Sequence, residues 1–126
     1  MDITPLIRAG QPVIQAYSAD GFRVSGVSYK GAVLITPDHC MNWAVAETAD
    51  KMAEDGLLKA IEQAAYKPDV ILLGTGTSLV LPPAWVRTAR ARIGAPVEVM
   101  DTAAACRTFN LLLTEARLVL ACLYPV

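Results

Sequence analysis

The chain has 126 residues, of which 54% are hydrophobic and 18% are charged, and its formal net charge at pH 7 is −1. This length predicts a single domain over residues 1–126, and so apolar and weakly charged a composition excludes a disordered chain. The near-neutral charge also argues against a nucleic-acid-binding protein, because such proteins usually carry an excess of Lys and Arg.

The first third of the chain is typical of short strands joined by tight turns. Short strands are expected at Phe22–Val24, Val27–Tyr29 and Ala32–Thr36, separated by glycine-containing turns. A further short strand is expected over Asn42–Ala46, around Trp43. We therefore expect an N-terminal β-meander that extends or caps the main sheet.

The middle of the chain alternates between helical and strand patterns. Helical periodicity between residues 54 and 65 predicts a helix that ends before Pro68. Val70–Leu73 is a continuous apolar run, as expected for a strand buried on both faces. Pro82-Pro83 then opens a second helix, which Gly94 ends.

The last part of the chain continues this alternation. Val97–Met100 is expected to be a strand, Asp101 or Thr102 to cap a helix running to about Glu115, and Arg117–Leu123 to be a final strand. The helix is expected to bury Ala105, Phe109, Leu112 and Leu113, with a polar stripe of Arg107, Asn110 and Thr114. The β-α-β-α-β order predicts an α/β domain with a largely parallel sheet and helical crossovers.

The local feature most informative about function is the segment Gly74-Thr75-Gly76, which follows a strand expected to be buried. Its glycines allow a sharp turn and a close approach to a ligand, and its N–H and hydroxyl groups could hold an anion. The segment matches neither a dinucleotide fingerprint nor a P-loop, because Leu79 occupies the third glycine position and no Gly-Lys-Ser/Thr follows. The alternative is a tight structural turn beneath the sheet edge.

Asp101-Thr102 lies at the end of the next strand. In an open parallel sheet, ligands bind at the carboxyl ends of strands, so this pair and the Gly74–Gly76 loop are expected to border one crevice. The helix N-terminus would add positive charge there, and Arg107 could contact a carboxylate or phosphate. Helix capping and a surface arginine are the alternative explanation.

Catalytic and metal-binding residues are not evident in the sequence. Cys106 could be a nucleophile near a helix N-terminus, but a cysteine beside an apolar face is more often a core residue. The sole histidine, His39, and three scattered cysteines do not have the spacing of a metal site. The odd cysteine number and an N-terminus unlike a signal peptide lead us to expect a cytoplasmic protein without a membrane span, a cofactor or a metal.

Four segments together resemble one known family. They are Asp69–Gly76, Leu81–Pro83, Val97–Thr102 and Ala105–Asn110. The combination is similar to the domain-of-unknown-function family numbered 498, which includes the mitochondrial respiratory complex I assembly factor three. The resemblance implies a three-layer fold with a central mixed sheet flanked by helices, and a role in complex I assembly together with a protein partner.

These observations leave two hypotheses about function. The first is a non-enzymatic binding or assembly module, with an exposed apolar patch that contacts a protein partner or a second copy. The second is a protein that binds a small anion, or an enzyme, using the crevice lined by Gly74, Thr75, Gly76, Asp101, Thr102 and Arg107. We expect the first, and we expect no binding of nucleic acid.

Overall fold

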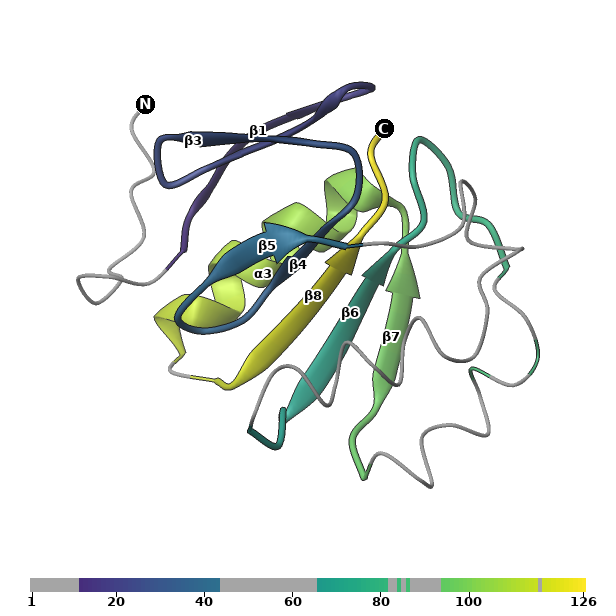
Figure 1. Ribbon diagram of the computed structural model, residues 1–126. Helices are drawn as coiled ribbons and strands as arrows, with labels where there is room; N and C mark the ends of the chain where they lie inside the picture. The colour runs from purple at the N-terminus through teal and green to yellow at the C-terminus, as the bar shows by residue number, and fades with distance from the viewer. Residues whose placement is uncertain (1–11, 44–65, 82–83, 85, 87–93, 116) are drawn as a thin grey trace.

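The computed structural model describes residues 12–43, 66–81, 84, 86, 94–115 and 117–126. These residues form one helix and eight strands, arranged in two sheets (Figure 1). In chain order they are β1 (Ile14–Ser18), β2 (Gly21–Val24), β3 (Val27–Lys30), β4 (Val33–Ile35), β5 (Cys40–Asn42), β6 (Val70–Gly74), β7 (Val97–Met100), α3 (Thr102–Thr114) and β8 (Val119–Leu123). The expected mixed α/β class is confirmed.

The larger sheet has five strands in the order β5-β4-β8-β6-β7. Strands β8, β6 and β7 are parallel to one another, whereas β4 is antiparallel to both β5 and β8. Within this sheet two strand pairs are parallel and two are antiparallel, so the expectation of a largely parallel sheet is corrected to an evenly mixed one. The cause is β4, which pairs with β8 instead of remaining with the N-terminal strands.

The smaller sheet is an antiparallel meander in the order β1-β2-β3. The meander was expected, but its membership differs from the prediction. β1 was not predicted, and Ala32–Thr36, expected as its third strand, contributes β4 to the larger sheet. The strand expected over Asn42–Ala46 is placed too late, because β5 ends at Asn42; residues 44–46 lie outside the described part of the chain.

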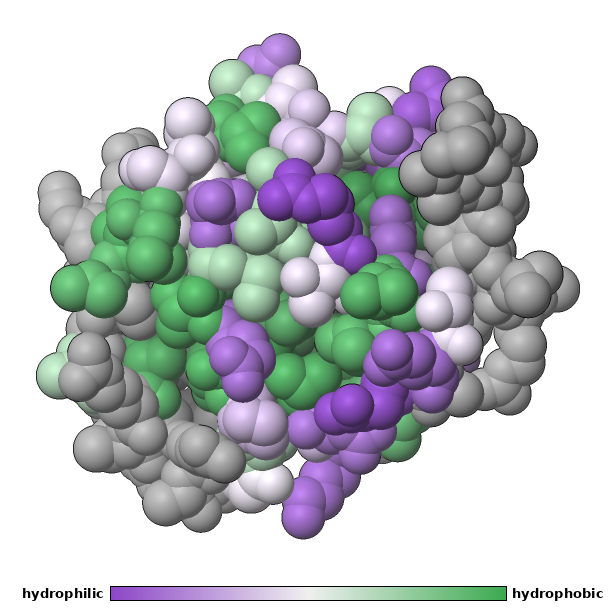
Figure 2. Space-filling model, turned by 180° about the vertical axis from the view of Figure 1, so that it is seen from behind, coloured by the Kyte–Doolittle hydropathy of each residue, from purple (hydrophilic) through white to green (hydrophobic). Residues whose placement is uncertain are grey.

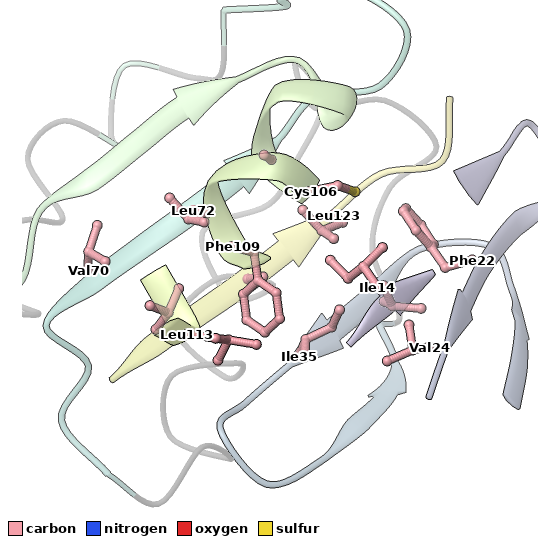
Figure 3. Close-up of a cluster of buried hydrophobic side chains, with 14 residues drawn as sticks. Ile14, Phe22, Val24, Ile35, Val70, Leu72, Cys106, Phe109, Leu113 and Leu123 are labelled. Carbon is pink, nitrogen blue, oxygen red and sulfur yellow. The ribbon is translucent and has the colours of Figure 1, made fainter. Parts of the chain in front are cut away.

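Strands β6 and β8 are buried along their whole length and send alternate side chains to opposite faces of the larger sheet. On one face, side chains of these strands pack with α3 and with the inner side of the meander (Figure 3). Phe109 of α3 lies between the two sheets there and is fully buried. On the other face, Leu34, Ile71 and Leu73 pack with Trp43 and Val86. The continuous apolar run in β6 thus has the two-sided burial that was predicted.

Helix α3 lies behind the larger sheet in Figure 1 and confirms the predicted helix to within one residue at each end. The helices expected at residues 54–65 and after Pro82-Pro83 lie outside the described residues, apart from Val86, which is helical and buried. The three-layer arrangement therefore stays a prediction. Over the described part of the chain, α3 included, no helix has the length and apolar character needed to cross a membrane.

Candidate functional site

The loop after β6 and the N-terminus of α3 are in direct contact. Strands β6 and β7 are parallel neighbours, so their carboxyl ends lie side by side, as the crevice hypothesis requires. The Thr102 N–H donates to the Gly76 carbonyl oxygen at 2.9 Å, and the Gly76 N–H donates to the Thr102 hydroxyl oxygen at 2.8 Å. The sequence argument thus brought the correct two segments together.

Thr102 is the centre of this junction. Its hydroxyl group, besides accepting from Gly76, donates to the Tyr124 carbonyl oxygen at 2.6 Å, and the residue is completely buried. The Tyr124 N–H in turn donates to the Gly74 carbonyl oxygen at 2.9 Å. One hydroxyl therefore connects the glycine loop, the start of α3 and the segment after β8.

Thr75 is engaged in a second set of bonds on the other side of the loop. Its N–H donates to the Met100 carbonyl oxygen at 2.9 Å, and its hydroxyl donates to the Ser78 carbonyl oxygen at 2.8 Å. The same hydroxyl accepts from the Val80 N–H at 3.0 Å. These bonds fold residues 75–80 into a compact turn.

The two glycines are needed for different reasons. A Cβ atom on Gly74 would lie 2.9 Å from a methyl carbon of Leu123 and 3.1 Å from the Cα atom of Thr102, so a larger residue would require the Leu123 side chain and α3 to shift away from β6. Gly76 has φ +107°, a conformation that side-chain-bearing residues rarely adopt. Both glycines thus permit the close contact between loop and helix.

Asp101 and Arg107 take no part in the side-chain bonds that join Gly76 to Thr102. The Asp101 carboxylate is the N-cap of α3 and accepts from the Ala104 N–H at 2.8 Å, as predicted for a capping residue. Arg107 is exposed. A small anion at the junction would have to displace the bonds between Gly76 and Thr102 or bind beside them near the Asp101 carboxylate. Ligand binding by the six candidate residues therefore stays a prediction.

The cysteines have the surroundings of core residues. Burial raises the pKa of the Cys106 thiol to about 12, against a smaller lowering by Arg107, and the side chain is 3% exposed. Burial likewise raises the pKa of Cys122, and it raises that of the half-buried Cys40 to about 11. These thiols are protonated at neutral pH, the form that is a poor nucleophile. Within the described residues, no three His, Cys, Asp or Glu side chains cluster as a metal site would require.

Sequence reasoning missed one polar contact that joins helix α3 to strand β1 of the smaller sheet. Asn110 was expected in a polar stripe of α3, and its side chain accepts from the Ile14 N–H at 3.3 Å and donates to the Ile14 carbonyl oxygen at 3.2 Å. The polar stripe did not indicate that Asn110 has a partner in β1. The two residues are 96 positions apart in sequence, so no local pattern could have revealed the contact.

Apolar side chains also reach the surface. The most exposed are Leu81 at 72%, Leu111 at 60% and Leu79 at 58%. Figure 2, which shows the molecule from the α3 side, has apolar patches interrupted by hydrophilic side chains. The exposed leucines come from separate elements, the loop after β6 and the outer side of α3.

Comparison with known proteins finds a matching family and several similar proteins. The family model described as "Protein of unknown function (DUF498/DUF598)" matches residues 14–124. A protein of Xenopus tropicalis named NADH dehydrogenase (ubiquinone) 1 alpha subcomplex assembly factor 3 is 33% identical over 113 residues. That match covers 89% of this chain but 60% of the Xenopus protein, so the chain spans less than two thirds of the length of this relative.

Two bacterial proteins are similar over most of their length. An uncharacterised protein of Rhodobacter capsulatus is 30% identical, and the match covers 94% of this chain and 88% of that protein. The crystal structure of a Bordetella parapertussis protein superposes with a TM-score of 0.79 at 32% identity, covering 94% of this chain and 98% of the other. The similarity thus extends over sequence and fold together.

Proposed function

We propose that this chain, which belongs to the DUF498/DUF598 family, is a non-enzymatic protein-binding module that assists the assembly of respiratory complex I. The observation that carries the proposal is the similarity to relatives named as complex I assembly factors, which covers 89% of this chain. A protein partner follows from such a role, because an assembly factor acts by binding components of the complex. We also propose that the complete fold has three layers and that the protein is cytoplasmic.

Two features of the described residues support a binding role over catalysis. The Cys106 thiol, near the N-terminus of α3, is buried and protonated at neutral pH, whereas a cysteine nucleophile needs an accessible thiolate. In addition, Leu79, Leu81 and Leu111 expose large apolar side chains on two separate elements, and contact with a partner would remove this apolar surface from water.

The test is a clean gene deletion in a host that encodes both this chain and complex I. We expect less fully assembled complex on a native gel and lower NADH:quinone oxidoreductase activity in membranes, both restored by the wild-type chain. Normal complex levels in the deletion strain would refute the proposal. Complementation by Cys106→Ala separates binding from thiol chemistry, because a module that only binds tolerates this small change in its core.

A second candidate function is the binding of a small anion at the junction of Gly74–Gly76 with the N-terminus of α3. It is favoured by the contact of the glycine loop with the N-terminus of α3, where backbone N–H groups favour an anion, and by Arg107 further along the same helix. It ranks second because the Gly76 N–H and the Thr102 hydroxyl already bond to each other. Calorimetric titration with phosphate and citrate tests it: Arg107→Gln should weaken binding, whereas Arg117→Gln, a change at another exposed arginine, should not.

A further inference from the structure

The outer face of the meander combines two cations with very small side chains. This face consists of Ala16, Ser18, Gly21, Arg23, Ser28 and Lys30. The six residues form two rows across the three strands. Arg23 is paired with Ala16 and Ser28, and Gly21 is paired with Ser18 and Lys30. Paired residues in antiparallel strands project to the same side. Phe22 and Val24 project to the opposite side, into the core.

The same six residues line a hollow of about 350 Å³ on the surface of the meander. Arg23 and Lys30 are exposed, and within the described ranges neither has an ion-pair partner. Asp20 also lines the hollow and leaves it with a formal charge of +1. The hollow is therefore a positively charged site on a chain whose net charge is −1.

Strand β1 offers a backbone edge beside this hollow. Within the described residues β1 pairs with β2 alone, and Asn110 binds the backbone of the edge at Ile14. Beyond that point the strand is exposed from residue 15 to residue 18. Natural proteins protect such edges with charges, proline or bulges. β1 has an irregularity between Ile14 and Ala16, but its residues carry no charge and no proline.

The alternation of antiparallel pairing indicates which backbone groups are available. A two-residue turn joins Ser18 to Gly21, and the pair that closes such a hairpin is hydrogen bonded. Tyr17, the residue before it, then directs its N–H and carbonyl groups away from β2. Its side chain is 40% exposed. The edge at Tyr17 can therefore accept a further strand.

We infer that the protein partner docks here by adding an extended acidic segment alongside β1, with its acidic side chains over the meander hollow facing Arg23 and Lys30. Main-chain bonds to the β1 edge supply affinity and the cations supply selectivity, as in other cases of strand addition. Ala16 and Ser18 lie between the edge and the cations, and their small size leaves the path open. This inference rests on the proposed protein-binding function and names the chemistry of the partner.

A second copy of the chain fits this surface less well than an acidic partner. Pairing of two β1 edges would bring two positively charged outer faces side by side, and like charges at an interface oppose association. A partner segment with glutamate or aspartate on alternate residues places every acidic group on the side of the cations, because side chains alternate along a strand.

The direct test uses a fluorescein-labelled peptide of alternating Glu and Val, with an alternating Lys and Val peptide for comparison. Fluorescence anisotropy should show binding of the acidic peptide only. The double variant Arg23→Glu/Lys30→Glu should weaken it by about tenfold or more, since it replaces attraction by repulsion. The matched variant Lys67→Glu/Arg117→Glu changes the net charge equally at exposed positions on other segments and should leave binding within about twofold. Tyr17→Pro, which removes the outward N–H, should also weaken binding.

Each contrary outcome overturns the inference. Equal binding of both peptides, no binding, or an unaffected Arg23→Glu/Lys30→Glu variant would refute it. Light scattering that shows a dimer lost in Tyr17→Pro would assign the edge to a second copy, and full competition by inorganic phosphate would assign the hollow to a free anion. In the deletion strain, complete rescue by Arg23→Glu/Lys30→Glu would refute this docking site alone, whereas a deletion without effect would refute the assembly role itself.

Discussion

Replacing Thr102 by valine tests whether its hydroxyl holds the glycine loop and the C-terminal segment to α3. Valine keeps the size and the β-branched shape but removes the hydroxyl that bonds at 2.8 Å to Gly76 and at 2.6 Å to Tyr124. Both partners are backbone groups, and Thr102 itself has no exposed surface, so water cannot replace the lost bonds. A buried group left without its partner costs about 1–3 kcal/mol, and we expect a total loss of about 2–4 kcal/mol.

The assay is urea denaturation followed by tryptophan fluorescence and circular dichroism. Trp43 stacks edge-on against Tyr124, with ring centroids 5.3 Å apart, so its fluorescence monitors the neighbourhood of the lost bond. For a domain of this size the loss corresponds to a fall in Tm of about 8–16 °C. Thr102→Ser keeps the hydroxyl and removes one methyl group, which should cost about 1 kcal/mol. A Thr102→Val variant no less stable than Thr102→Ser would refute the reasoning.

Three further predictions concern packing, sheet attachment and thiol reactivity. Gly74→Ala should lower stability by about 1–3 kcal/mol because its Cβ atom meets β8 and α3; an unchanged thermal midpoint would contradict this. Asn110→Ala should cost about 1–3 kcal/mol and speed amide hydrogen exchange at Ile14, and unaltered exchange there would show that the contact is dispensable. At about pH 8 the thiols stay protonated below their raised pKa values, so iodoacetamide labelling should be slow and rise with pH; mass spectrometry should find Cys40 labelled before Cys106.

The elements with strong local signals were predictable from the sequence. β6 is a continuous apolar run, and α3 has both a capping residue and an apolar stripe, so each matches its predicted range closely. β1 was missed because it is an edge strand whose residues are mostly exposed, so its sequence lacks the alternation of apolar and polar residues that predicts a strand. The transfer of β4 to the larger sheet was missed because it depends on pairing with β8, which no local pattern encodes.

The candidate site was predictable in outline for a similar reason. The rule that ligand sites lie at the carboxyl ends of parallel strands correctly brought the Gly74–Gly76 loop beside Thr102. It could not foresee that Tyr124, in the segment after β8, supplies the acceptor for the Thr102 hydroxyl. Residue types alone suggest which polar groups could bind a ligand. Whether those groups are free to do so depends on contacts with residues distant in the sequence.

The position of β8 has a consequence for synthesis of the chain on the ribosome. β8 lies at the centre of the larger sheet, between β4 and β6, yet it is translated after every other strand described. Until β8 emerges, β4 and β6 cannot be joined into one sheet, because β8 is the strand that pairs with both. The sheet therefore closes only after β8 has left the exit tunnel, and until then the apolar faces of β4 and β6 are open to aggregation.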